Sequence, residues 1–366
     1  MPFLLADDLT GAAEVAAICF ESGNRAFVYD WDSPFWKEPS GNSSDFHVLN
    51  TDSRMLSPDE ARDRLYRLAL DLKPRALCYK KIDSLLRGPV LSEIEGLLEN
   101  TGSIRALLIP QNPSMRRTIS SGEYRVGGSP LDQTELIRDP AFPIHTSKVD
   151  MLLGMGFTTL ASPSPLTGQG IFLGEAETHD EIKSWASCLD SQTLPVGGSD
   201  FFQALLKPHR TPPPTTEIPP VGLFLSGSTS SQSERFFASN RYSRLAALTI
   251  DQLNQILGGN ADLRTPDSLP PAICSNELPP TFDFISTAAR IIQVLQPRHF
   301  YVEGGSTAAR LLKKLECHYL EVQRVWGKGT VTLRTPGPPH SQRWISTKPS
   351  AFPWPEGFPF ASTPGT

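Results

Sequence analysis

The sequence lacks paired cysteines. Its five cysteines are an odd number, they lie far apart, and no two of them form a CxxC pair. This spacing argues against metal ligation by cysteine and predicts reduced thiols, as in a protein that works in the cytoplasm. Apolar stretches of about 18 residues, which a membrane helix needs, are also missing, and the N-terminus carries acids where a signal peptide needs an apolar run. We therefore expect a soluble, unexported, cytoplasmic protein without a membrane partner.

Dense runs of lysine and arginine are absent as well, and the formal net charge at pH 7 is -5. Binding to nucleic acid through phosphate contacts needs clustered positive charge, so we expect no nucleic-acid partner. Two common nucleotide-binding motifs are missing: the GxxxxGK[ST] of a P-loop and a GxGxxG after a strand. The second absence counts against an NAD-linked dehydrogenase, which only the general fold pattern would suggest.

What is present is an alternation of short apolar runs with amphipathic runs through the first third of the chain. The apolar runs predict buried strands and the amphipathic runs predict helices. Such alternation is typical of an α/β fold with a doubly wound, mostly parallel sheet. The predicted strands are 3–6, 26–29, 46–50, 76–79 and 106–109, and the predicted helices are 12–22, 58–72 and 89–99. Ser57 and Glu60 predict a capping box at the start of the second helix.

The length of 366 residues suits two domains. A Pro-rich piece at 207–220, "KPHRTPPPTTEIPP", predicts a semi-rigid linker between a first domain at 1–206 and a smaller α/β domain at 221–366. The second domain has predicted strands at 221–225 and 299–302. From about 115 to 159 the pattern is irregular, which predicts an excursion over the surface near the site. We expect the site in the cleft between the domains.

Polar residues follow the predicted strands of the first domain at the points where they end. Asp7 and Asp8 follow the first strand, "TDSR" at 51–54 follows the third, "KKIDSLLRG" at 80–88 follows the fourth, and "PQNPSMRRTISSG" follows the fifth. Each loop alone has a plain explanation as a helix cap or a solvated surface. Together they lie at one sheet edge, where Arg can grip a carboxylate and Asp can accept from hydroxyls. The edge predicts a site for a small, hydroxylated, anionic molecule.

The second domain carries two Gly/Ser turns, each between a strand and a helix. They are "FLSGSTSSQSERF" at 224–236 and "FYVEGGSTAARLLKKL" at 300–315, where we expect the helix to begin near Ala308. Glycines let the backbone approach phosphate oxygens, and a helix N-terminus supplies free N–H groups. A single turn of this kind fits an ordinary connection as well as it fits a phosphate-binding loop. Two such turns in one domain favour nucleotide binding.

The motifs "LADDLTGA", "TDSR", "KKIDSLLRG", "RRTISSGEYRVGGSPLDQTELIRDP", "SGS", "GGST" and "KPSAFPWP" occur in an order that resembles the four-carbon acid sugar kinase family. The resemblance covers nearly the whole chain. It implies an N-terminal domain that binds the acid sugar and a C-terminal domain that binds ATP, with Mg²⁺ for phosphoryl transfer. Members of the family phosphorylate threonate, erythronate or oxo-tetronates, usually at the terminal hydroxyl.

The resemblance also implies site residues. Those that would contact the acid sugar are Asp8, Arg54, Lys81, Asp83, Ser84 and Arg87. Those that would hold ATP are Ser226, Ser228, Gly304, Gly305, Ser306, Thr307 and Ser350. The chain departs from the family pattern at Leu85, where Thr is common, at Ser306, where an acid is usual, and at Ser350, where Gly is usual.

These features predict an ATP-dependent kinase of four-carbon acid sugars, in which Arg54 and Arg87 hold the substrate carboxylate. Asp83 is the predicted residue that acts on the attacking hydroxyl, because the two lysines beside it would keep its carboxylate ionised, and Asp8 is the alternative. The alternative is a degenerate relative that binds the acid sugar as a sensor without turnover. These features do not determine the stereochemistry of the acid sugar or the oligomeric state of the protein, for which a homodimer is one of the alternatives.

Overall fold

The computed structural model describes residues 2–39, 41–72, 76–135, 142–206, 213, 217–227, 246–259, 270–275, 278, 282–327, 329–338, 341–349, 355 and 358. The chain forms two compact units. Unit 1 contains Met1–Asn24 and Tyr29–Pro212, and unit 2 contains Arg25–Val28 and Pro213–Thr366. Of the predicted linker, only residues 213 and 217–220 are among those described. Within the described residues, no helix has the length and apolar character needed to cross a membrane.

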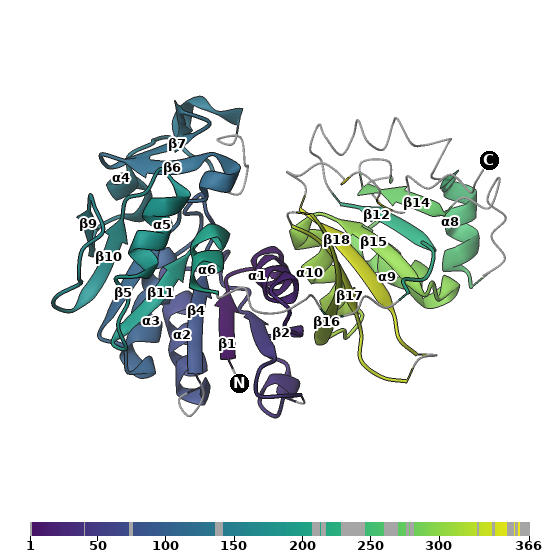
Figure 1. The fold of residues 1–366 in the computed structure, drawn as a ribbon. Helices are drawn as coiled ribbons and strands as arrows, with labels where there is room; N and C mark the ends of the chain where they lie inside the picture. Colours follow the sequence, from purple (N-terminus) through teal and green to yellow (C-terminus); the bar gives the residue numbers. More distant parts are fainter. Residues whose placement is uncertain are drawn as a thin grey trace. The chain divides into compact units, whose positions relative to one another are not determined.

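Unit 1 is built on a parallel sheet with the strand order β3-β1-β4-β11-β5-β10-β9 (purple to teal in Figure 1). Helix α2 packs on α3, and α6 packs on both α1 and α5. The strands are β1 (Pro2–Ala6), β3 (Phe46–Asn50), β4 (Ala76–Lys81), β5 (Arg105–Ile109), β9 (Phe157–Leu160), β10 (Gly170–Gly174) and β11 (Thr193–Gly197). The residues of β2 (Ala26–Asp30) are divided between the two units. The helices are α1 (Leu9–Glu21), α2 (Pro58–Leu72), α3 (Val90–Thr101), α4 (Val149–Leu153), α5 (His179–Ala186) and α6 (Ser199–Leu205). The predicted mostly parallel α/β sheet is confirmed.

Two local predictions for unit 1 need correction. Strand β4 runs two residues beyond its predicted end, so Lys80 and Lys81 belong to the strand and are buried. The stretch predicted to be irregular contains a small antiparallel sheet of β6 (Arg117–Ser120), β7 (Glu123–Val126) and β8 (Ser129–Pro130). Its two turns, at 121–122 and 127–128, have positive φ at both residues. These are the tight hairpin turns that Gly favours, which is why the sequence looked irregular.

The capping box predicted for α2 is present. The backbone N–H of Ser57 donates to Glu60 Oε2 at 3.0 Å, and the backbone N–H of Glu60 reaches Ser57 Oγ at 3.4 Å. The side chains of Ser57 and Glu60 therefore each accept a hydrogen bond from the backbone N–H of the other residue. Helix α2 begins at Pro58, as predicted.

Strand β11 lies between β4 and β5 and pairs with both in parallel. Backbone hydrogen bonds continue beyond the ladder, from Ile82 N to Gly197 O at 3.1 Å and from Gly198 N to Ile109 O at 2.9 Å. The Tyr79 hydroxyl also donates to Gly198 O at 2.6 Å. A segment that follows β5 by more than 80 residues thus completes the middle of the sheet.

Unit 2 has a sheet in the order β13-β14-β12-β15-β18-β17-β16 (green to yellow in Figure 1). Its strands are parallel from β13 to β18, and β17 is antiparallel to both β18 and β16. The strands are β12 (Leu223–Ser226), β13 (Ala246–Ala247), β14 (Pro271–Cys274), β15 (His299–Glu303), β16 (Tyr319–Gly327), β17 (Thr330–Arg334) and β18 (Trp344–Lys348). The helices are α8 (Ile250–Leu257), α9 (Phe284–Leu295) and α10 (Gly305–Lys314). The two strands predicted here correspond to β12 and β15.

Gly96 sets the packing distance between α2 and α3. A Cβ at this position would lie 2.3 Å from the backbone oxygen of Arg62 in α2, closer than real Cβ atoms approach. Gly96→Ala should lower the free energy of unfolding by about 1–3 kcal/mol, because forced separation of the helices outweighs the better helix propensity of alanine. Chemical denaturation measures this, with Ser92→Ala in the same helix as the control. Equal stability of the two variants would contradict the prediction.

Candidate functional site

Arg54 is the centre of a cluster of charges at the carboxyl ends of β1, β3 and β4. Its Nε donates to Asp7 Oδ2 at 2.7 Å and its Nη1 to Asp8 Oδ2 at 2.5 Å. Its Nη2 lies 3.8 Å from Asp83 Oδ1. The two aspartates follow β1, Arg54 follows β3 and Asp83 follows β4. The fold thus brings together Asp8, Arg54 and Asp83, as the parallel order of the strands leads one to expect.

Asp7 and Asp8 share one guanidinium but differ in their electrostatics. Burial raises the pKa of a carboxyl, yet for Asp7 the charges of Arg54 and Lys80 outweigh it and hold the pKa below its usual value. For Asp8, burial and the neighbouring Asp7 charge outweigh Arg54, so the pKa lies above its usual value. Asp8 Oδ1 also accepts from Gly11 N at 2.7 Å and caps α1. Asp7 Oδ1 is buried and has no hydrogen-bond partner among the described residues.

Asp83 is held far more tightly than Asp8. The Arg87 guanidinium donates to both of its carboxylate oxygens, at 2.7 Å and 2.8 Å, and the backbone N–H of Leu85 donates at 3.2 Å. Burial would raise the pKa of Asp83, but Arg54 and Arg87 hold it well below the usual carboxyl range. The Asp83 carboxylate is therefore ionised, and its oxygens accept hydrogen bonds from the residues of the turn at 83–87.

The two lysines at the end of β4 are paired with carboxylates that the sequence analysis did not single out. Lys81 Nζ lies 3.1 Å from Glu14 Oε2, and Lys80 Nζ lies 2.9 Å from Glu93 Oε2. Burial would lower the pKa of Lys81, but the neighbouring carboxylates, Glu14 first among them, raise it. The signal that could have found both acids is their position, since each interrupts an otherwise apolar helix face.

Glu93 also ties the loop that carries Arg54 to helix α3. Ser53 Oγ donates to Glu93 Oε1, and Thr51 Oγ1 lies 2.6 Å from Ser53 Oγ. The side chains of Lys80 and Glu93 are 0% and 2% exposed, so this ion pair lies in the core beneath the site. Lys80, Glu93 and Ser53 therefore form a buried chain that fixes the residue before Arg54.

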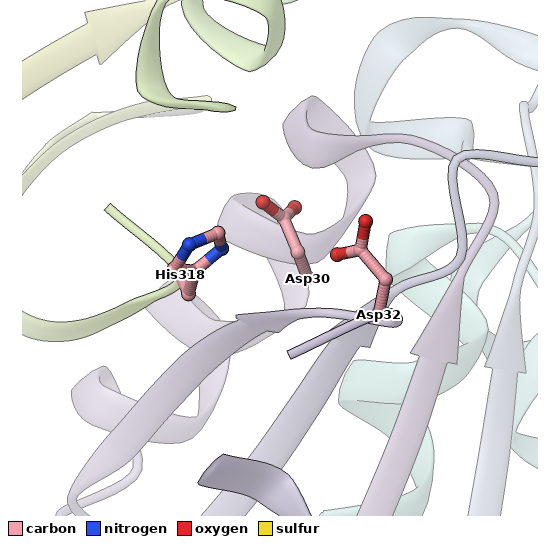
Figure 2. A group of neighbouring side chains, drawn as sticks. All are labelled: Asp30, Asp32 and His318. Atoms are coloured by element: carbon pink, nitrogen blue, oxygen red, sulfur yellow. The ribbon is translucent and has the colours of Figure 1, made fainter. Parts of the chain in front are cut away.

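Figure 2 shows a further pair of carboxylates in unit 1, Asp30 at the end of β2 and Asp32 just beyond it. Asp30 Oδ1 accepts from Asn50 Nδ2 at 3.0 Å, and Asn50 Oδ1 accepts from Asp52 N at 3.1 Å. The Asn50 side chain therefore supports the start of loop 51–54. The third residue labelled in Figure 2, His318, belongs to unit 2 and precedes β16.

Ser84 joins the small sheet to the site. Its Oγ accepts from Arg117 Nη1, and its backbone oxygen accepts from the Tyr124 hydroxyl. Tyr124 is fully buried, and burial raises the pKa of its hydroxyl well above the usual value. The small sheet is thus held against the loop that follows β4, so the segment predicted to run near the site contacts it at Ser84, although the sheet itself was not predicted.

Unit 2 carries polar residues at the ends of three neighbouring parallel strands. Ser226 ends β12, Glu303 ends β15 and Lys348 ends β18. Ser226 Oγ donates to Glu303 Oε2 at 2.9 Å, and Lys348 Nζ lies 2.8 Å from Glu303 Oε1. Glu303 was not predicted as a site residue, although it directly precedes the predicted glycine turn.

Helix α10 begins at Gly305, three residues before the predicted start near Ala308. Gly304 has φ +102°, and its N–H donates to Lys348 O at 2.9 Å, so the chain turns directly from β15 into the helix. Gly305, Ser306 and Thr307 consequently form the first helical turn. Gly227 lies against Thr307, since a Cβ on it would be 2.0 Å from Thr307 Oγ1. The predicted Ser228 and Ser350 lie outside the described residues.

Comparison with known proteins places unit 1 in a recognised group. Residues 3–187, half of the chain, match the family described as a sugar-binding N-terminal domain. The chain is 27% identical over 225 residues to the D-threonate kinase of Salmonella typhimurium, and this alignment covers 55% of this chain and 52% of that protein. It is 32% identical over 169 residues to the D-erythronate kinase of Heliobacterium modesticaldum, and this alignment covers 43% of this chain and 38% of that protein. The aligned part is thus about half the length of the first of these relatives, and less of the second.

Solved structures with the same fold cover almost the whole chain. One from Salmonella typhimurium aligns over 98% of both chains with a TM-score of 0.79 at 15% identity. A Haemophilus influenzae protein of the DUF1537 family aligns over 98% of both chains with a TM-score of 0.71 at 17% identity. At these identities the likeness concerns the fold alone. The match of the sugar-binding domain, together with the two kinase relatives, shows that the chain belongs to the four-carbon acid sugar kinase family.

Proposed function

We propose that the protein is an ATP-dependent kinase that phosphorylates a four-carbon acid sugar, such as threonate, erythronate or an oxo-tetronate, at its terminal hydroxyl. The observation that carries the proposal is the cluster in which Arg54, the adjacent Asp7 and Asp8, and Asp83 meet from three loops of the sugar-binding domain. Carboxylates accept hydrogen bonds from sugar hydroxyls, and the surrounding cations suit an anionic ligand. In this proposal Asp8, Arg54, Lys81, Asp83, Ser84 and Arg87 contact the substrate.

Of the two carboxylates considered as the catalytic base, the environments favour Asp8. Its side chain is 25% exposed, against 8% for Asp83, and its pKa is raised whereas that of Asp83 is strongly lowered. A base with a raised pKa takes up a proton more readily in the transition state. In the proposed step, the substrate hydroxyl oxygen bonds to the γ-phosphorus of ATP, the bond to the bridging oxygen breaks, ADP leaves, and the hydroxyl proton passes to Asp8.

For the nucleotide, we propose the ends of β12 and β15 in unit 2. The N–H groups of the first turn of α10, at Gly305, Ser306 and Thr307, suit phosphate oxygens, and Gly304 and Ser226 adjoin them. Ser228 and Ser350 complete the proposed set. Mg²⁺ would enter with the ATP phosphates, which together with water commonly supply most of its ligands. No protein ligand for Mg²⁺ is part of this proposal.

ATP consumption with a panel of substrates tests the proposed function. The D and L forms of threonate and erythronate, with oxo-tetronates, should include at least one substrate. Erythritol and threitol, which lack the carboxylate, should not be phosphorylated. A thermal-shift series on the same compounds reports binding separately, since a ligand that binds only the native state raises its melting temperature. Binding without turnover would identify a sensor, and absence of tetronate binding would refute both functions.

A further inference from the structure

Arg117, the first residue of β6, differs from the other cations of the site in its partners. Its Nη1 donates to Ser84 Oγ, and the part of the chain that the structure describes offers its guanidinium no ion pair. In contrast, Arg54 is paired with Asp7 and Asp8, and Arg87 is paired with Asp83. A guanidinium has five N–H donors, so the bond to Ser84 leaves most of its fork for another acceptor.

The fold holds Arg117 in place before any ligand arrives. Its backbone exchanges hydrogen bonds with Asn112, N to O at 3.0 Å in both directions. Two residues further along β6, Ile119 pairs with Tyr124 of β7, and both side chains are fully buried. Because the Tyr124 hydroxyl also donates to the backbone of Ser84, the strand carrying Arg117 is anchored to the site loop.

The site therefore has charge polarity. At one end Asp7 and Asp8 share the single guanidinium of Arg54, which leaves a surplus of negative charge and a buried Asp7 oxygen without a hydrogen-bond partner in the described chain. At the other end Arg117 adds positive charge beside Ser84. Ser84 follows Asp83, whose carboxylate lies 3.8 Å from Arg54, so both ends belong to one site.

We infer that Arg117 binds the carboxylate of the acid substrate beside Ser84, which directs the substrate hydroxyls toward Asp8. The inference rests on the proposed function, and it adds a residue that makes the site bind acid substrates in preference to neutral ones. To bind the carboxylate in the same way, Arg54 or Arg87 would have to release a protein carboxylate, and Arg117 would not. A planar fork that can make two parallel hydrogen bonds also fixes the direction of the ligand.

Isothermal titration calorimetry tests the inference with the tetronate that the wild type binds best and with its neutral amide. Arg117→Gln should weaken binding of the acid by about 10- to 100-fold, the range for hydrogen bonds to charged groups, and leave the amide within about twofold. Arg116→Gln is the matched control. It removes the same charge one residue away, where the side chain is exposed and donates to Gly127 O at 3.1 Å, and should change neither affinity.

The outcomes separate the inference from the function on which it rests. Equal acid affinity in the Arg116 and Arg117 variants, or an equal loss for the acid and the amide, would overturn the inference and leave the proposed function standing. Absence of tetronate binding by the wild type would overturn both. If Arg117→Gln fails to fold, Arg117→Lys replaces it, and its preference for the acid over the amide should fall severalfold because the fork is lost. An unchanged preference in that variant would overturn the inference.

Discussion

Asp8→Asn should lower kcat for tetronate phosphorylation by about 10²- to 10⁴-fold, the usual contribution of a positioned base. Asn keeps the size of the side chain and caps a helix as well as Asp does, so the bond from Gly11 N and the start of α1 should survive. What the variant loses is the ability to accept the hydroxyl proton. Steady-state kinetics, with circular dichroism to establish folding, measures the effect.

The pH profile offers a second readout of the same role. Because the pKa of Asp8 is raised, kcat/KM of the wild type should fall as the pH drops through a range above that of an ordinary carboxyl. Asp8→Asn should lack this limb, since the asparagine does not titrate. Asp83→Asn is the comparison variant. If it abolishes turnover while Asp8→Asn retains it, the two aspartates have the opposite roles.

Lys80→Met should lower the free energy of unfolding by about 3–5 kcal/mol, because it leaves the Glu93 carboxylate in the core without its cation. The lysine side chain is fully buried and its ion pair with Glu93 measures 2.9 Å, so solvent cannot compensate for the loss. Methionine has nearly the length of lysine and fills most of the same volume. The measured loss in the free energy of unfolding therefore reports the unpaired charge of Glu93 rather than a cavity.

The double variant Lys80→Met/Glu93→Leu is the control for this effect. Replacing both partners of a buried pair with apolar residues is often nearly neutral, so the double variant should regain most of the lost stability. Denaturant titrations of both variants give the comparison. A single variant as stable as the double variant would show that the ion pair does not hold this part of the core together.

The sequence was sufficient to predict which loops meet at the site, because parallel strands place their carboxyl ends at one edge. Asp8, Arg54 and Asp83 lie in these loops, and the family resemblance is what singled them out as site residues. The sequence was not sufficient to predict how the charges pair. Which of several aspartates accepts from Arg54 depends on distances of about an ångström, and these are set by tertiary packing rather than by spacing along the chain.

The residues that sequence reasoning missed are mostly single acids with a buried cation as partner. Glu93 lies on the apolar face of α3, and Glu303 ends a fully buried strand directly before the Gly-Gly turn, so neither was predicted as a site residue. Their roles appear only when Lys80 and Lys348 are placed beside them. The start of α10 was misjudged for a local reason, since the positive φ of Gly304 makes the turn shorter than a Gly-Gly-Ser-Thr loop suggests.

The central place of β11 affects how the sugar-binding half can be excised for separate production. The family match ends at residue 187, whereas the strand that joins β4 to β5 begins at Thr193. A fragment cut at 187 would keep the charged cluster around Arg54 but would expose two unpaired edges in the middle of its sheet, a template for aggregation. A usable fragment has to continue through α6 to Leu205, so the boundary that sequence similarity defines is not the boundary at which this half of the protein is closed.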